Sequence, residues 1–274
     1  MSNLSITPAF ERHNLQSMIA RSAQRNGVDF HYLMAQAQLE SSMRPDAKAS
    51  SSSATGLYQF VEQTWLGLVK QKGDQYGLGW AQNAISQDRH GKFLVADKGQ
   101  KSSILALRED PKLSANLAGE FARENSAFLQ SKLGREPESV DLYLAHFLGP
   151  AGAGKFLKAF DANSQAAAAP SFPSAARANR SIFYDKSGDA RSFQAIRNLF
   201  ISKLENASIQ ASGNNFPVSG NRLPQTDRPL PMVQPADYLR IAKNHINDQS
   251  RSETAKPFNE SARLAYLMLT SLGM

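Results

Sequence analysis

Apolar residues recur at helical spacing from the start of the chain. Residues 9–25 place apolar side chains at roughly helical intervals and stop at Gly27, which predicts a first helix. Asp29 then offers an N-cap for a second helix over 30–42, whose positions are largely apolar and therefore predict burial. Pro45 ends this helix, because proline disfavours helical geometry in the residue before it.

After a polar loop the helical repeat resumes at Gly56, with Phe60, Thr64 and Leu68 at helical spacing. Five glycines break the periodicity between residues 70 and 109. The segment 92–96 lies among them and is a candidate short strand. We therefore expect one small β-hairpin in this part of the chain.

Two longer amphipathic helices follow, and each starts at an acidic residue before a proline. Asp110-Pro111 starts the first, which runs to Gly134, and Glu136-Pro137 starts the second, which ends at Gly149-Pro150. A short helix over 151–160 completes the pattern. The sequence thus predicts a mainly α fold, with one helical domain over residues 9–160.

The composition changes from residue 161. Alanine, serine and proline dominate 161–180, which predicts a linker, and 180–184 is expected to be extended or irregular. Residues 181–274 then form a helical, partly disordered C-terminal extension, in which the proline-rich segment 207–234 is expected to be flexible. Three short helices are expected in the extension: 189–205, 236–247 and 258–272.

Composition and charge exclude several kinds of function. The chain has no cysteine, which removes disulfides, thiolate zinc sites and cysteine nucleophiles, and its five histidines lack the close spacing of metal ligands. We therefore expect no metal and no cofactor. The net charge of +7 and pI near 9.6 predict attraction to an anionic polymer: nucleic acid, lipid headgroups or a carboxylate-bearing cell wall.

Neither a membrane span nor a secretory signal is expected from the sequence. No window approaches 18 consecutive apolar residues. The first fourteen residues lack the basic and apolar regions of a signal peptide. Any export route is left open.

Glu40 is the candidate for acid–base chemistry. It falls in the last turn of the helix over 30–42, at i+7 from Leu33 and i+3 from Ala37, near the apolar side. Burial and the negative end of the helix dipole both disfavour an ionised carboxylate, so its pKa is expected to be raised. A general acid needs this shift at neutral pH, whereas the simpler alternative is a surface glutamate at a helix end.

The loop after Glu40 is polar and built from small residues. The hydroxyls of Ser50–Ser53 suit sugar groups or serve as flexible filler. Gly56 permits the close approach of a backbone or a ligand, and Gln59 offers both a donor and an acceptor.

These residues together resemble a known signature. Glu40-Ser41 and Gly56-Leu57-Tyr58-Gln59, with Pro45, Ala47, Ser50 and Ala54 between them, are similar to the glutamate-serine to glycine-leucine-methionine-glutamine signature of the soluble lytic transglycosylases. This family is a branch of the lysozyme-like superfamily that includes the g-type lysozymes, and it usually has methionine where Tyr58 stands. The resemblance implies a lysozyme-like helical domain with Glu40 as catalytic acid. It also implies the following substrate-facing residues: Ser41, Ser50, Gly56, Tyr58 and Gln59.

Two later stretches resemble further motifs of the family. Residues 116–121 are similar to a motif in which asparagine and glycine precede an aromatic residue on a core helix, and Glu120 is the residue there expected to enter the cleft. Residues 143–150 are similar to the motif alanine-tyrosine-asparagine-alanine-glycine-proline. His146 takes the place of a tyrosine that contacts the catalytic glutamate, and Phe147 takes that of the asparagine. The resemblance covers roughly residues 12–160.

The resemblance implies cleavage of peptidoglycan at the β-1,4 bond between N-acetylmuramic acid and N-acetylglucosamine. A lytic transglycosylase would use Glu40 as acid and then as base while the muramyl C6 hydroxyl closes a 1,6-anhydro ring. A hydrolytic muramidase would need a second carboxylate. A non-catalytic peptidoglycan-binding or assembly protein on the same scaffold is the remaining alternative. The candidates for a second carboxylate are Asp74, Asp97, Glu120 and Asp141.

The expected partner is therefore the glycan strand of peptidoglycan in the cell envelope, the periplasm, rather than nucleic acid. The C-terminal extension is a candidate binding part for a secretion or envelope-assembly partner.

Overall fold

The computed structural model describes residues 8–50 and 52–212. The helices predicted at 236–247 and 258–272, and most of the predicted flexible segment, lie outside the described residues. Within the described part the protein is mainly helical, with a single two-stranded antiparallel sheet. The predicted fold class is thereby confirmed.

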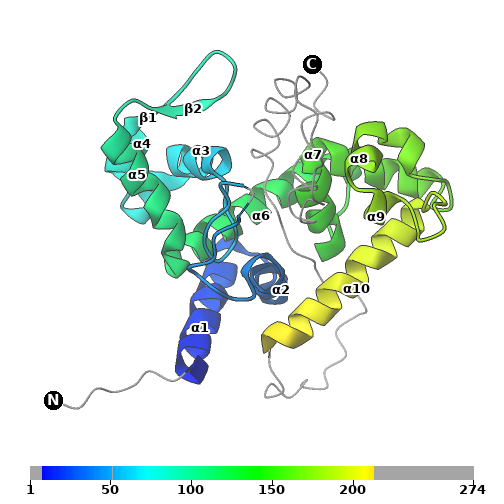
Figure 1. The fold of residues 1–274 in the computed structure, drawn as a ribbon, viewed down its shortest axis with the longest axis horizontal. Coiled ribbons are helices and arrows are strands. Elements are labelled where there is room, and N and C mark those ends of the chain that lie inside the picture. Colours follow the sequence, from blue (N-terminus) through cyan, green and yellow to red (C-terminus); the bar gives the residue numbers. More distant parts are fainter. Residues whose placement is uncertain (1–7, 51, 213–274) are drawn as a thin grey trace.

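Helix α6 runs through the middle of the structure (Figure 1). The helices α3 to α5 and the β-hairpin lie on one side of it, and α7 to α10 lie on the other. The helices are α1 (Pro8–Asn26), α2 (Phe30–Ser41), α3 (Glu62–Lys72), α4 (Gly79–Ala84), α5 (Lys98–Ala106), α6 (Pro111–Leu133), α7 (Ser139–Ala162), α8 (Pro173–Ala178), α9 (Arg180–Phe183) and α10 (Phe193–Ser212). The 3-10 turns are η1 (Gly73–Tyr76), η2 (Leu107–Glu109) and η3 (Ala169–Ser171), and the strands are β1 (Ile85–Gln87) and β2 (Phe93–Val95).

Several predicted helix ends coincide with caps in the structure. The Asp29 carboxylate accepts a hydrogen bond from the Tyr32 N–H at 2.8 Å, and Asp110 accepts one from the Leu113 N–H at 2.9 Å. Gly134 ends α6 with a φ of 70°, in the left-handed region that glycine adopts without strain. The hairpin pairs Ile85 with Val95, so the predicted strand at 92–96 is present.

The helix predicted from Gly56 starts later, at Glu62. Gly56 has a φ of 87° and Gln59 a φ of 47°, and two left-handed residues cannot continue a right-handed helix. The sequence does not predict α5, because the glycines between residues 70 and 109 interrupt the helical spacing of its apolar residues. Helix α7 consists of two helical segments that meet at a kink at Gly149, whose φ of 74° marks the predicted break.

The Ala/Ser/Pro-rich segment 161–180 is folded, so the prediction that it is an irregular linker is wrong. It contains η3 and α8, and Ala168 and Phe172 are buried in the core. Four of its alanines (Ala168, Ala169, Ala175 and Ala176) are buried, so the segment packs on the core instead of joining two parts as a linker. Two neighbouring predictions are corrected as well: 180–184 forms α9 instead of an extended stretch, and 207–212 ends α10 instead of starting the flexible segment. The division of the chain into domains stays a prediction.

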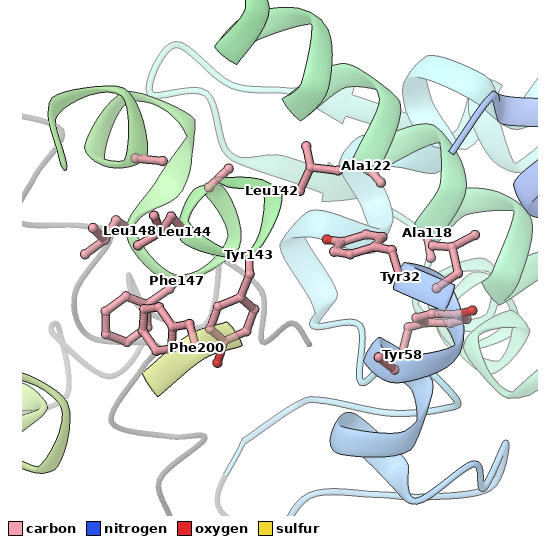
Figure 2. Packing of buried hydrophobic residues seen from close by; sticks show 14 of the residues in the cluster. Tyr32, Tyr58, Ala118, Ala122, Leu142, Tyr143, Leu144, Phe147, Leu148 and Phe200 are labelled. Atoms are coloured by element: carbon pink, nitrogen blue, oxygen red, sulfur yellow. The ribbon is translucent and has the colours of Figure 1, made fainter. Parts of the chain in front are cut away.

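Aromatic rings join the C-terminal helices to the rest of the core. The ring of Phe200 on α10 lies 4.6 Å from that of Tyr143 and 4.9 Å from that of Phe147, both on α7 (centroid distances). Figure 2 shows the three rings together where α7 meets α10. Helix α10 also packs along α2, and the Gln16 amide donates to the Ala211 carbonyl at 3.1 Å. Residues up to 211 therefore share one hydrophobic core with α1, α2 and α7.

Phe200→Ala is expected to lower the free energy of unfolding by about 3–5 kcal/mol, because it opens a cavity in this aromatic cluster. Thermal or urea unfolding measures the change. Ile209→Ala on the same helix is the matched control, since that side chain is 61% exposed, and it should change stability by less than about 0.5 kcal/mol. Equal effects of the two substitutions would show that α10 does not belong to the core.

Candidate active site

Glu40 lies in the last turn of α2, where the helix stops abruptly. Ser42 and Met43 have φ values of 54° and 63°, and their N–H groups donate to the carbonyls of Gln38 and Ala37 at 2.8 and 3.1 Å. This left-handed ending turns the chain away at once. The Glu40 side chain is left enclosed, with 4% of its surface exposed.

Burial raises the pKa of Glu40 well above its ordinary value. A buried carboxylate loses the hydration that stabilises its charge, so the neutral, proton-bearing form is favoured. The shift has the direction expected from the sequence. Glu40 can therefore keep a proton to donate at a pH where an exposed glutamate is ionised.

His146 on α7 faces Glu40. Its Nε2 lies 3.8 Å from the Glu40 Oε1, and its side chain is fully buried. Neither ring nitrogen has a hydrogen-bond partner among the described residues. Burial lowers the pKa of His146 well below its ordinary value, so the imidazole is neutral at neutral pH and adds no positive charge that would ionise Glu40.

Three buried tyrosines complete the surroundings of Glu40. The pKa of Tyr32 is raised by burial and by the nearby Glu40, Tyr143 and Tyr58. Tyr58 is buried, and its hydroxyl has no hydrogen-bond partner among the described residues. The ring of Tyr143 lies 5.5 Å from that of His146. Figure 2 shows Tyr32, Tyr58 and Tyr143 within the same core region.

The sequence reasoning did not propose Tyr32 or Tyr143 as site residues. Tyr32 lies eight positions before Glu40, so two helical turns place both on one face of α2. Tyr143 lies three positions before His146 on α7. A tyrosine at helical spacing from a buried ionisable residue is the signal that identifies such neighbours.

Ser41 and Gln59 hold the loop against α2. The Ser41 hydroxyl lies 2.8 Å from the Leu57 carbonyl oxygen and accepts a hydrogen bond from the Arg44 N–H at 3.0 Å. The Gln59 amide donates to the carbonyls of Ala47 and Gly56, both at 2.9 Å. Both side chains are buried and make these bonds within the protein. They fix the shape of the loop that follows Glu40.

Gly56 sits against backbone rather than facing an open space. A Cβ at this position would lie 2.0 Å from the Arg108 carbonyl oxygen, and the φ of 87° is strained for any other residue. The Arg108 side chain in turn donates to the carbonyls of Ser53 and Phe60 at 2.6 and 3.0 Å. Gly56 therefore lets the loop close onto the segment that carries Arg108.

Gly56→Ala is expected to destabilise the fold by at least about 3 kcal/mol, because it combines a left-handed φ with a backbone clash. Gly77→Ala separates the two causes: Gly77 has a φ of 74° but no atom within 4 Å of its added Cβ. That control should cost only about 1–2 kcal/mol. Equal losses in the two melting curves would mean that the contact with Arg108 contributes nothing.

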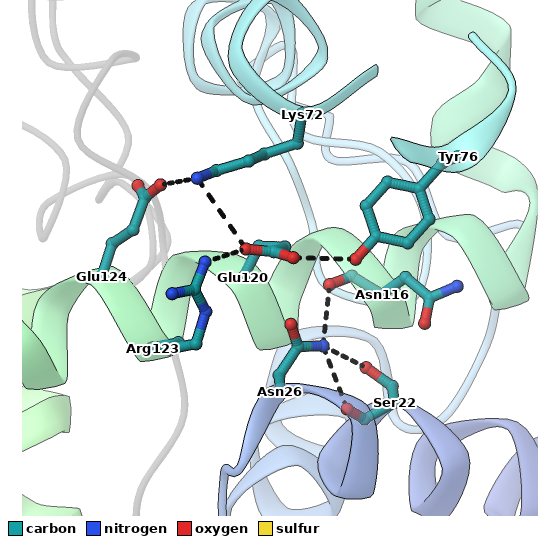
Figure 3. A network of polar contacts seen from close by, with 8 residues as sticks. All are labelled: Ser22, Asn26, Lys72, Tyr76, Asn116, Glu120, Arg123 and Glu124. Atoms are coloured by element: carbon teal, nitrogen blue, oxygen red, sulfur yellow. Dashed lines mark hydrogen bonds and ion pairs between the residues drawn. The ribbon is translucent and has the colours of Figure 1, made fainter. Parts of the chain in front are cut away.

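The other predicted site residues are placed differently. Ser50 is exposed on the loop. Glu120 on α6 belongs to a separate polar network, in which Tyr76 donates to it at 3.0 Å and Arg123 at 2.6 Å (Figure 3). Thus Glu40 and His146 are brought together, and both Glu40 and Tyr58 lie near Tyr32, whereas the predicted contact of Glu120 with the same cleft stays a prediction.

Each candidate second carboxylate has a role in the fold or lies at the surface. Asp97 caps α5 by accepting from the Gln100 N–H at 2.6 Å, and Asp74 is exposed in η1. Asp141 is fully buried in an ion pair with Arg135 at 2.7 Å. Burial acts to raise the pKa of Glu120, but hydrogen bonds from Arg123 and Tyr76 hold it below its ordinary value.

A comparison with known families matches the part of the chain that contains Glu40. Residues 17–83 match a family model described as Transglycosylase SLT domain. The match runs from α1 into α4 and so includes Glu40, Ser41, the loop and Gln59, whereas Glu120 and His146 lie beyond it.

Proteins with SLT domains act on peptidoglycan in the cell envelope, so the match supports a lytic transglycosylase-type function in general. None of the helices within 8–50 and 52–212 has the length and apolar character needed to cross a membrane. Through residues 17–83 the chain is similar to the transglycosylase SLT domain family, which confirms the resemblance seen in its sequence.

Proposed function

We propose that this protein is a lytic transglycosylase that cleaves the β-1,4 bond between N-acetylmuramic acid and N-acetylglucosamine, with Glu40 as general acid and then base. The observation that carries the proposal is the enclosed Glu40 side chain, whose pKa is raised by burial. A proton-bearing carboxyl group inside an SLT-like segment is suited to protonating a glycosidic oxygen.

The reaction needs one carboxyl group and no water. Glu40 donates its proton to the glycosidic oxygen, the bond to the muramyl C1 breaks, and the substrate's N-acetyl group assists at C1. The resulting Glu40 carboxylate then takes the proton of the muramyl C6 hydroxyl, whose oxygen attacks C1 and closes the 1,6-anhydro ring. The proton returns to Glu40, and the enzyme is ready for another bond.

The roles of three of the four candidate second carboxylates support this route over hydrolysis. A hydrolytic muramidase would typically place a second carboxylate at a defined distance across the sugar. Asp97 and Asp141 are used in a cap and an ion pair, and Glu120 is paired with Arg123. Within the described part of the chain, Glu40 is an acidic residue whose surroundings favour the neutral form.

The remaining predicted residues have proposed roles around Glu40. Tyr58 and His146 have buried polar atoms without hydrogen-bond partners among the described residues, and we assign these atoms to contacts with Glu40 or with a bound substrate. Ser41, Gly56 and Gln59 would shape the loop against which the glycan lies, and the exposed Ser50 would contact sugar at its rim. Binding of a secretion or envelope-assembly partner by the C-terminal extension (181–274), of which the structure describes residues up to 212, stays a proposal.

Digestion of purified peptidoglycan in water enriched in oxygen-18 tests the reaction type. A transglycosylase releases 1,6-anhydro muropeptides with no label, because water does not enter the product. Labelled reducing ends would replace the proposal with a muramidase. Intact peptidoglycan after prolonged incubation with folded protein would favour a non-catalytic binding protein.

A further inference from the structure

A second polar site lies between α1, η1 and α6. It is an open cavity of about 480 Å³ whose six lining residues are all polar. None of these residues belongs to the group around Glu40. The lining residues are Arg25, Asn26, Gln75, Tyr76, Glu120 and Arg123.

The charges around Glu120 balance one another and leave Arg25 in excess. Glu120 pairs with Arg123 at 2.6 Å and more distantly with Lys72 at 3.9 Å, and Lys72 also pairs with Glu124 at 2.7 Å (Figure 3). Two carboxylates therefore face two cations. Arg25 has no ion pair with any carboxylate in residues 8–50 and 52–212, and its guanidinium lies 5.7 Å from the centre of the Tyr76 ring.

The inner wall of the cavity is held rigidly. The Asn26 amide donates to the Ser22 carbonyl at 3.0 Å and lies 3.5 Å from the Asn116 carbonyl oxygen. A Cβ on Gly119 would come within 2.4 Å of the same amide nitrogen, so only glycine permits this approach of α1 to α6. Asn26 and Glu120 are both buried and fixed before any ligand arrives.

The cavity offers a cationic side and an acceptor side to a ligand. Arg25 and the outer nitrogens of Arg123 present the planar N–H geometry that pairs with a carboxylate. Hydrogen bonds from Arg123 and Tyr76 keep Glu120 ionised against the effect of burial, so its oxygens can accept from a ligand N–H. A group with a carboxylate beside N–H donors matches both sides, whereas a plain sugar lacks the charge for Arg25.

We propose that this cavity binds a free peptide carboxylate of the peptidoglycan, with Arg25 and Arg123 holding the carboxylate and Glu120 accepting from the adjacent N–H group. The assignment of the peptide to peptidoglycan rests on the proposed function. The site would let the protein distinguish glycan strands that carry peptides from strands without them.

Binding of alanyl-alanine with a free carboxylate to the full-length protein, followed by calorimetry or NMR titration, tests the site without any turnover. Arg25→Gln is expected to weaken binding at least about 10-fold, because it removes the unpaired cation. The control is Arg21→Gln, one helical turn earlier on α1 and outside the cavity, which should bind as the wild type does. The C-terminal amide of the same dipeptide should bind at least about 10-fold more weakly than the acid.

Equal binding of the acid and the amide, or no effect of Arg25→Gln, would overturn the proposal. Inorganic phosphate that competes as strongly as the dipeptide would also overturn it, since the cavity would then be a general anion site. The proposed function fails separately: a protein that binds the dipeptide but releases nothing from peptidoglycan keeps this site and loses the enzyme assignment. In an active protein, Arg25→Gln should raise KM for peptide-bearing glycan and leave KM for peptide-free glycan unchanged.

Discussion

Glu40→Gln is expected to lower the rate of peptidoglycan solubilisation by about 10²–10⁴-fold, the usual contribution of a general acid. The amide has nearly the same shape but no proton of suitable acidity to donate. The loss is measured as the decrease in turbidity of a peptidoglycan suspension. Glu205→Gln, an exposed glutamate on α10, is the matched control and should keep the wild-type rate.

The same substitution is expected to raise thermal stability. Because the folded pKa of Glu40 lies above the unfolded value, folding binds a proton at pH values between the two, and stability falls as pH rises through the folded pKa. Glutamine does not titrate, so the variant lacks this loss. The wild type and Glu40→Gln should have the same melting temperature below about pH 4, and the melting temperature of the variant should become the higher one toward neutral pH. The expected gain in the free energy of unfolding is about 0.5–2 kcal/mol, which is typical of replacing a residue that is kept for function at a cost in stability.

A melting temperature that falls at neutral pH in Glu40→Gln would contradict the burial argument, even if activity were lost. Unchanged activity with unchanged folding would contradict the acid assignment itself. The two readouts therefore separate the electrostatic account of the site from its chemical role.

His146→Phe is expected to lower the same rate about 10-fold, since interaction energies between contacting groups reach about 0.5–3 kcal/mol. The ring would fill the buried space but would present no polar atom to Glu40, whose Oε1 lies 3.8 Å from the His146 Nε2. His146→Gln keeps a neutral polar group of similar size and should recover most of the activity. Such a rescue would identify His146 as a positioning residue for Glu40 rather than a packing residue.

The pH dependence of activity distinguishes an electrostatic effect of His146 on Glu40 from a role in packing, because a packing residue would not change it. The pKa of His146 lies below its ordinary value, so a positive imidazolium forms only on the acid side, 3.8 Å from Oε1, where it lowers the pKa of Glu40. Tyr32 and Tyr58 also face this region, but their raised pKa values keep them neutral throughout. The Glu40 carboxylate that forms after proton donation is then a weaker base toward the C6 hydroxyl, so activity of the wild type should begin to decline at a higher pH than that of either variant. An identical acid limb in all three proteins would exclude this role.

Sequence reasoning located Glu40 because its signals are local. The Asp29 cap, the apolar repeat and the spacing of Glu40 from Leu33 are all read within one helix, and the structure has them. The same locality explains the helix ends at Gly27 and Gly134. The short strand at 92–96 was also predicted from its local sequence, where glycines interrupt the helical spacing.

The errors arose where distant segments decide the conformation. Nothing in the local sequence shows that Gly56 meets the Arg108 carbonyl, yet that contact makes the loop continue to Glu62. The segment 161–180 has the composition of a linker, but in the folded protein Phe172 packs against the rings of Phe156 and Phe183. These contacts form only when the helices assemble, so the local sequence does not show them. The hydrogen bond from Tyr76 to Glu120 likewise joins residues more than forty positions apart, so the polar network around Glu120 could not be predicted from its local sequence.

Mass spectrometry of the material released from purified peptidoglycan tests the central claim most directly. The account predicts muropeptides with 1,6-anhydro ends from the wild-type protein and almost none from Glu40→Gln under the same conditions. The same muropeptides in equal yield from both proteins would contradict it.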